Sequence, residues 1–142
     1  MTSKAERIAA AVATTVTAPA MTNVPPSRVF RDLYGAIGAG ALPAIAIETG
    51  NEEPGDRAVL GFVERVLDVR LHVVAMGDYS AGDAALVEAY GRIAANPTLA
   101  GLAFDFQDAG TQRERDEAER RICLTTKTLR YRYRTTEESL EN

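Results

Sequence analysis

His72 is the only histidine of this 142-residue chain, and its imidazole is the side chain best suited to acid–base chemistry near neutral pH. It belongs to an alternating segment in which Asp68 and Arg70 share its face. A catalytic dyad needs a nucleophile and an orienting acid within hydrogen-bond reach. Asp68 is about 13 Å away at about 3.3 Å per strand residue, too far for direct contact. The pattern therefore predicts a surface or interface histidine, not a catalytic one.

The single cysteine, Cys123, excludes an internal disulfide. It lies between Ile122 and Leu124, which is typical of a small buried hydrophobic side chain and not of a reactive thiol. One histidine and one cysteine, far apart in sequence, do not supply the usual zinc ligand sets. We therefore expect no zinc centre.

Two glycine-containing segments invite a ligand-binding interpretation. Residues 77–83 (GDYSAGD) lack the spaced acids of a calcium loop and the Gly-Lys-Ser/Thr of a phosphate loop, and fit a turn capped by Ser80 or Asp83. The glycines between 35 and 40 precede a strand instead of a helix, so a dinucleotide fingerprint does not fit. No catalytic residue, cofactor or metal site is predicted.

Charged side chains offer the clearest candidates for binding. Arg130, Arg132 and Arg134 alternate, so on a strand they share one face. Such a stripe is either a solvated face that deters edge pairing or a surface that meets an acidic neighbouring subunit or passing DNA. The acidic candidates for the opposite side of such a contact are Glu52, Glu53, Asp105 and Asp108. Each exposed pair contributes only ~0–1 kcal/mol, but several per interface would make assembly salt-sensitive.

Two amphipathic helices are predicted. The first spans residues 3–18, with Ser3 and Glu6 in a capping-box pattern, an apolar stripe along Ile8, Val12 and Val16, and Pro19 as a stop. The second begins at Ser80 or Asp83 and runs to about residue 95, before Asn96-Pro97. Its predicted core stripe consists of Leu86, Tyr90, Ile93 and Ala94.

Period-two patterns predict strands at 28–31, 42–48, 63–76, 102–106 and 121–135. In strand 63–76, one face carries Val63, Leu67, Val69, Leu71, Val73 and Ala75, and the other carries Glu64, Asp68, Arg70 and His72. This alternation predicts one buried and one wet face. Residues 33–41, 49–58 and 112–121 are predicted to be loops, the second mobile in the free subunit. A switch of apolar parity predicts a bulge near 125–128. The expected fold is α+β: a mixed, mostly antiparallel sheet of four or five strands with two helices packed on one face.

Composition agrees with one soluble domain over 1–136 and a disordered acidic tail over 137–142. The formal net charge of −4 argues against specific nucleic-acid binding, because phosphate contacts need clustered Lys and Arg. No apolar run approaches the ~20 residues of a membrane helix, and the N-terminal stretch is too polar for a signal peptide.

The order of these segments resembles the tail terminator family of long-tailed phages, also known as minor tail protein U or tail completion proteins. The similarity extends from about residue 5 to 135 and is distributed. After the N-terminal helix it includes Arg-Val-Phe (28–30), Leu-Pro-Ala-Ile-Ala-Ile (42–47), the strand over 65–73, Asn-Pro-Thr-Leu-Ala-Gly-Leu (96–102) and Tyr-Arg-Tyr-Arg-Thr (131–135).

The resemblance implies a non-enzymatic homo-oligomeric ring, typically a hexamer, in the virion at the head-proximal end of the tail, assembled in the host cytoplasm. Its implied partners are other copies of itself, the major tail-tube protein and a head-completion or neck protein, with DNA passing through the lumen without specific binding. It implies no cofactor. The alternatives are another head–tail connector or neck protein and a small-molecule-binding regulatory α+β domain, with an enzyme third.

Overall fold

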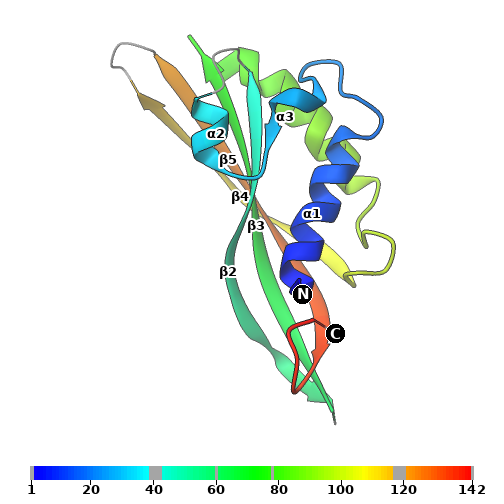
Figure 1. Cartoon of the computed structure of the whole chain (residues 1–142). Helices are drawn as coiled ribbons and strands as arrows, with labels where there is room; N and C mark the ends of the chain where they lie inside the picture. Colours follow the sequence, from blue (N-terminus) through cyan, green and yellow to red (C-terminus); the bar gives the residue numbers. More distant parts are fainter. Residues whose placement is uncertain (1, 39–42, 60, 78, 117–120, 142) are drawn as a thin grey trace.

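The computed structural model describes residues 2–38, 43–59, 61–77, 79–116 and 121–141. It is a long, twisted five-stranded sheet with three α-helices, in the strand order β1-β2-β3-β5-β4 (Figure 1). The strands are β1 (Val29–Phe30), β2 (Ala44–Val59), β3 (Phe62–Met76), β4 (Asp105–Asp116) and β5 (Ile122–Thr136). The helices are α1 (Lys4–Thr17), α2 (Leu33–Ile37) and α3 (Tyr79–Ala94), with a 3₁₀ turn at Pro26–Arg28. Only the β1–β2 pair is parallel, which confirms the predicted mixed, mostly antiparallel sheet.

The central pair β3–β5 is antiparallel and in continuous register from Phe62 opposite Thr136 to Met76 opposite Ile122. Successive side chains on a strand alternate between the two faces of the sheet. The odd-numbered apolar residues of both strands therefore share one face, and α1 and α3 cover it (Figure 1). This core holds Leu67, Val69, Leu71, Val73, Leu129, Tyr131 and Tyr133, and it confirms the two helices on one face.

The sequence predicts that the opposite face of the sheet is wet, but part of that face is covered. Its upper part carries a second, smaller core of Ala44, Ala46 and Val74 beneath α2. α2 itself corrects the predicted loop at 33–41: Asp32 caps it by accepting a 2.5 Å hydrogen bond from the Gly35 amide. Residues 39–42 lie outside the described part of the chain.

The second core also explains why no bulge occurs at 125–128. The β3–β5 register is unbroken there, so the predicted bulge is wrong. The apolar parity of β5 changes because Ile122 and Leu124 face the α2 side, whereas Leu129 and the tyrosines face α1 and α3. Helices can cover one face of a sheet at one end of a strand and the other face at its other end, without any change in backbone register.

Two predicted loops are strands. Residues 49–58 belong to β2 and pair with β3, with register shifts between Thr49 and Glu52 and between Pro54 and Ala58. Residues 112–116 likewise extend β4 alongside β5, and 117–120 lie outside the described residues. Charged and glycine-rich segments form strands here because a long partner supplies backbone hydrogen bonds, and the shifts in β2 accommodate residues that fit a regular ladder poorly.

The two long helices begin and end close to their predicted limits. In α1, the Ser3 hydroxyl accepts from the Glu6 amide at 3.1 Å, as predicted, while the Glu6 carboxylate pairs with Arg31 at 2.8 Å. In α3, the predicted caps Ser80 and Asp83 lie inside the helix, because it begins at Tyr79. The predicted core residue Ala94 is exposed, whereas Ala85, Leu86, Ala89 and Ile93 are buried.

The described end of the chain lies beside its beginning (Figure 1). The Leu140 carbonyl accepts from the Lys4 amide at 2.7 Å, and the Glu137 amide donates to the Gly61 carbonyl at 3.2 Å. The first bond places the acidic tail against the start of α1, and the second places it beside Gly61, just before β3. Its disorder in solution stays a prediction.

Two buried tyrosines of β5 differ in one hydrogen bond. The Tyr133 hydroxyl donates to the Glu52 carboxylate, whereas the Tyr131 hydroxyl has no partner among the described residues. Burial raises the pKa of Tyr131 above its ordinary value. An unsatisfied buried hydroxyl costs about 1–3 kcal/mol.

We therefore expect Tyr131→Phe to leave the free energy of unfolding unchanged or to raise it, and Tyr133→Phe to lower it by ~0.5–1.5 kcal/mol. Urea unfolding of both variants at neutral pH measures the difference. A larger loss from Tyr131→Phe than from Tyr133→Phe would contradict the assignment.

Candidate assembly interface

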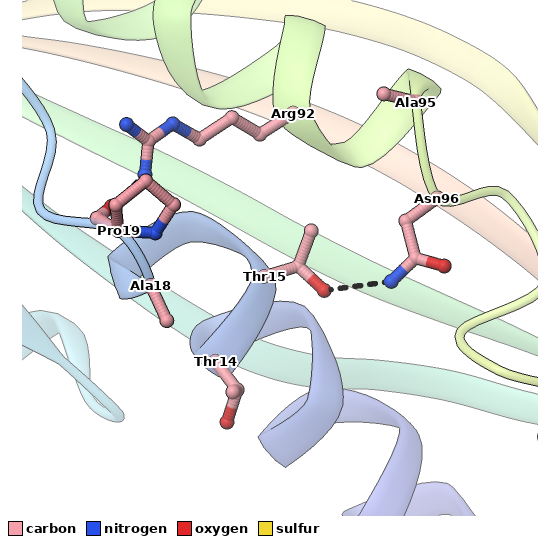
Figure 2. A pocket seen from close by; sticks show the side chains of 7 residues that line it. All are labelled: Thr14, Thr15, Ala18, Pro19, Arg92, Ala95 and Asn96. Atoms are coloured by element: carbon pink, nitrogen blue, oxygen red, sulfur yellow. Dashed lines mark hydrogen bonds between the residues drawn. The ribbon is translucent and has the colours of Figure 1, made fainter.

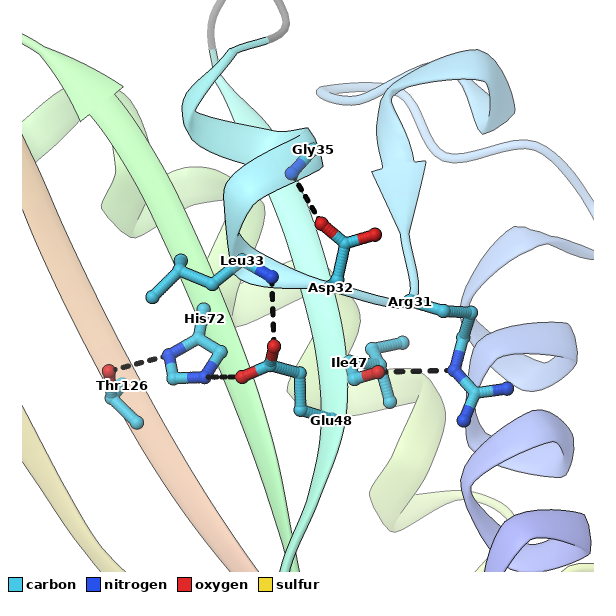
Figure 3. Close-up of polar contacts among 8 residues, drawn as sticks. All are labelled: Arg31, Asp32, Leu33, Gly35, Ile47, Glu48, His72 and Thr126. Carbon is cyan, nitrogen blue, oxygen red and sulfur yellow. Dashed lines mark hydrogen bonds and ion pairs between the residues drawn. The ribbon is translucent and has the colours of Figure 1, made fainter.

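His72 lies in a polar chain that crosses the sheet and reaches α2 (Figure 3). Its Nδ1 is 2.8 Å from Thr126 Oγ1 on β5, and its Nε2 is 3.0 Å from Glu48 Oε1 on β2. The other oxygen of that carboxylate accepts from the Leu33 amide at 2.9 Å, at the start of α2. His72 is 6% exposed, so the prediction of a surface or interface histidine is wrong.

A hydroxyl, an imidazole and a carboxylate in sequence are also the parts of a nucleophilic triad. Here the imidazole is buried, and Thr126, which would be the nucleophile, is half-buried. The three depressions described below are lined by other residues. Burial lowers the pKa of His72, and Glu48 opposes that shift. The arrangement suits a structural role, in which a neutral imidazole joins three strands and α2.

The predicted arginine stripe lies on the same face of the sheet as α2, in the part that α2 does not cover. Arg130 Nε donates to Asp68 at 3.0 Å. Arg132 donates to both oxygens of Asp105, at 3.0 and 2.7 Å, and also lies 3.6 Å from Glu64. The bidentate bond from Arg132 lowers the pKa of Asp105. The structure thus brings predicted partners together within one subunit.

Within the described part of the chain, the other charged candidates also have partners in the same subunit, except Glu53. Asp108 pairs with Lys127, and that ammonium lowers the pKa of the carboxyl. Glu52 accepts from Tyr133, and the Arg134 guanidinium lies over the rings of Phe62 and Phe104 at 5.4 and 5.3 Å. Glu53 is exposed on β2 opposite Val66. A contact between subunits through Asp105 or Asp108 would have to exchange bonds that already exist.

The helical side of the molecule has a different chemistry. A depression of about 460 Å³ lies between the ends of α1 and α3. Figure 2 shows the residues that line it: Thr14, Thr15, Ala18, Pro19, Arg92, Ala95 and Asn96. Arg92 donates to the carbonyls of Val16 at 2.9 Å, of Ala20 at 3.2 Å, and of Pro19. A cation at the last carbonyls of a helix is favourable, so Arg92 closes the end of α1.

Glu88, one turn before Arg92 on α3, also binds the segment that follows α1. Its carboxylate accepts from the amides of Thr22 and Asn23 at 3.0 and 3.1 Å, and these bonds lower its pKa. Glu88 and Arg92 of α3 therefore bind the backbone at the end of α1 and in the segment that follows it. Sequence patterns did not reveal this use, because the contacts span more than sixty residues.

The outward surface of α3 is consequently poor in charge. Asp83 is the only charged residue that is exposed in the described part of α3. Ala84, Val87, Gly91 and Ala94 are also exposed, Val87 at 66%. A surface helix ordinarily presents polar residues to solvent. Beside this surface is a groove of about 440 Å³ between α3 and the β4–β5 pair, which we name the α3 groove. It is lined by Leu86, Val87, Tyr90, Gly91, Thr111, Arg113 and Lys127.

A third depression, of about 200 Å³, lies on the other side of the sheet beside α2 and is lined by Ile37, Glu114, Arg115, Ile122 and Leu124. Among the described residues there is no group of three or more His, Cys, Asp or Glu side chains placed to hold a metal ion. No helix in the described part of the chain is long and apolar enough to cross a membrane.

Comparison with solved structures shows a similarity of fold. The fold is similar to that of a solved structure described as the virion of a native gene transfer agent particle, with a TM-score of 0.60 and 15% sequence identity over 90% of this chain and 95% of the other. No protein-family model matches the sequence, and no curated protein matches it either. At this identity the comparison establishes a shared fold along nearly the whole length of both chains.

The buried His72 predicts a specific dependence of stability on pH. Its folded pKa lies below the ordinary value of about 6.5, so its stabilisation is complete above that value and is lost as pH falls toward the folded pKa. No other histidine titrates in this range. We expect the wild-type protein to lose more unfolding free energy than His72→Gln between about pH 7 and about pH 5.5.

Urea unfolding at several pH values measures the two slopes, and it is the slope that tests the assignment, since the substitution also changes the stability at neutral pH. Parallel curves for the two proteins would show that His72 has no shifted pKa.

Proposed function

We propose that this chain is a structural, non-enzymatic tail protein of a phage-type particle that forms a homo-oligomeric ring, ends tube polymerisation and provides a docking surface for the head. The observation that supports this most strongly is the fold shared with a chain of a gene transfer agent virion over 90% of one chain and 95% of the other. Similarity that is nearly complete in both directions favours the same kind of component over a domain borrowed for another use.

The surfaces of the subunit fit an assembly role better than a catalytic one. The imidazole is buried in a structural network, and the charged candidates are mostly paired within the subunit. What remains available is a helical surface with few free charges and a groove beside it. Exposed apolar surface of this kind marks protein–protein contacts.

A ring follows from the geometry of a tube end. A tube presents several equivalent sites, which a single 15.3 kDa subunit cannot cover, and a closed ring can match them by symmetry. In this proposal the partners are other copies of the chain, the tail-tube protein and a head-completion or neck protein, and the site is the head-proximal end of the virion tail. A net charge of −4 is compatible with a lumen through which DNA passes without being held.

A neck protein of similar size is the alternative, because the description of the similar structure names the whole particle and no position within it. The two functions differ in the partner: a terminator binds tube ends, whereas a neck protein binds the head connector. Binding to each separately purified partner distinguishes them.

The proposal predicts concentration-dependent assembly and control of tube length. Purified protein is expected to show an increasing mass in light scattering as concentration rises, up to a closed ring, and to shorten tubes when added to polymerising tube subunits from the same gene cluster. Heat-unfolded protein is the control for nonspecific effects. A monomer at all concentrations, with unchanged tube lengths, would refute the terminator function and favour the neck protein.

A further inference from the structure

We infer that the Tyr34 side chain of one copy inserts into the α3 groove of the next copy, so that copies associate head to tail. The inference rests on the proposed function, because it names the contact by which a ring would form. It concerns two surfaces of the same chain, one on α2 and one between α3 and the β4–β5 pair.

Tyr34 is the most exposed of the large hydrophobic residues in the described part of the chain, at 89%. Its neighbours on α2 pack inward: Ala36 is fully buried in the second core, with Leu33 and Ile37 against it. Tyrosine is enriched at binding hot spots because it has a large apolar ring, a polar tip and few rotatable bonds. A ring left in solvent by an otherwise anchored helix suits a contact with another molecule.

The helix that carries Tyr34 is held on both sides of it. The Glu48 carboxylate accepts from the Leu33 amide, and the Asp32 carboxylate accepts from the Gly35 amide. Glu48 is fixed in turn by His72 (Figure 3). A contact residue on a preorganised backbone loses less conformational entropy on binding than one on a mobile loop.

The α3 groove has the space and chemistry to receive a tyrosine ring. A side-chain atom added at Gly91 would meet nothing within 4 Å, and Val87 beside it is 66% exposed. The rim carries Arg113 and also Lys127, whose ammonium is already paired with Asp108 and lies 5.1 Å from the ring centroid of Tyr90. An incoming ring can pack on Val87 and Gly91 and present its face to the Arg113 guanidinium.

Charge complementarity favours the same pairing. The exposed carboxylate of Asp32 lies two residues before Tyr34, and Arg113 lies on the rim of the groove. Opposite charges around an apolar contact fix orientation and speed association more than they raise affinity.

The two surfaces cannot meet within one subunit, because α2 and α3 cover opposite faces of the sheet (Figure 1). Their contact therefore joins two copies through two different patches. Such a heterologous contact forms a ring when its rotation closes. This geometry is the one a tube-capping ring requires.

Cysteine cross-linking tests the pairing directly. Tyr34→Cys and Val87→Cys are made separately in a Cys123→Ala background and mixed. The mixture is oxidised mildly at a concentration at which light scattering shows that this mixture itself assembles, because half of its copies lack the Tyr34 ring. We expect disulfide dimers in the mixture and few in either variant alone. Thr14→Cys, at the depression between α1 and α3, replaces Val87→Cys as the matched control and should cross-link poorly with Tyr34→Cys.

Three results would overturn the inference: dimers of Tyr34→Cys alone, equal cross-linking to position 14, or assembly without cross-linking of 34 to 87. Each of them leaves the proposed function intact. Absence of assembly under all conditions, together with unchanged tube length, would overturn both the contact and the function.

A second variant separates loss of contact from loss of folding. Gly91→Leu fills the groove while replacing a helical glycine, so its thermal midpoint should be unchanged or higher. We expect its apparent dissociation constant for assembly to rise at least about tenfold, as for a hot-spot residue. Ala10→Leu, at an exposed position of α1, is the control and should assemble normally. Unchanged assembly of Gly91→Leu, or an equal defect in Ala10→Leu, would contradict the pairing.

Discussion

The unbroken antiparallel register of β3 and β5 is the constraint on which the rest of the structure depends. Fifteen residue pairs in continuous register assign every side chain of two strands to one face or the other. A shift by one residue would move the whole apolar set to the wrong side of the sheet. The odd-numbered positions of β3 and β5 therefore determine where α1 and α3 pack, and the even-numbered ones determine what lies beneath α2 and what stays in solvent.

This division gives the subunit two chemically different sides. On the α2 side, the lower sheet face carries acids and bases that neutralise one another, such as Arg132 with Asp105 and Arg130 with Asp68. On the helical side, Glu88 and Arg92 bind backbone groups near the end of α1, and the outward surface of α3 after Asp83 consists mainly of small or apolar residues. The charged side is largely satisfied by itself, whereas the apolar side gains from a partner. This difference is the basis on which we propose assembly through α3.

The sequence predicted those parts of the fold that depend on local periodicity. The alternation of β3, the stripe of α1 and the Ser3 cap were all readable, because each depends on neighbours a few residues away. The extent of β2 and β4 was not readable, since their charged and glycine-rich stretches are strands only because β3 and β5 supply backbone partners. α2 was missed for a similar reason: a short helix rich in small residues is stabilised mainly by the core beneath it.

For the candidate interface too, the sequence did not reveal contacts between residues that are distant along the chain. The arginine stripe was found from its spacing, but spacing could not reveal that Asp105 and Asp108 are occupied within the subunit by Arg132 and Lys127. His72 was assigned to the wet face because its neighbours in sequence are charged, while the residues that bury it come from β2, β5 and α2. The sequence likewise did not indicate that Glu88 and Arg92 turn back toward the end of α1, because their partners are distant along the chain.

The salt dependence of self-association tests the central claim most directly, namely that copies meet through the apolar helical surface and not through the charged stripe. The association constant can be measured by sedimentation from about 0.05 to about 0.5 M sodium chloride, over which the Debye length falls about threefold. An apolar contact predicts an association constant that changes by less than about tenfold, because burial of apolar surface is insensitive to screening. A steep loss of association with rising salt would contradict the account. It would indicate instead that copies meet through Arg130, Arg132 and Arg134 of β5.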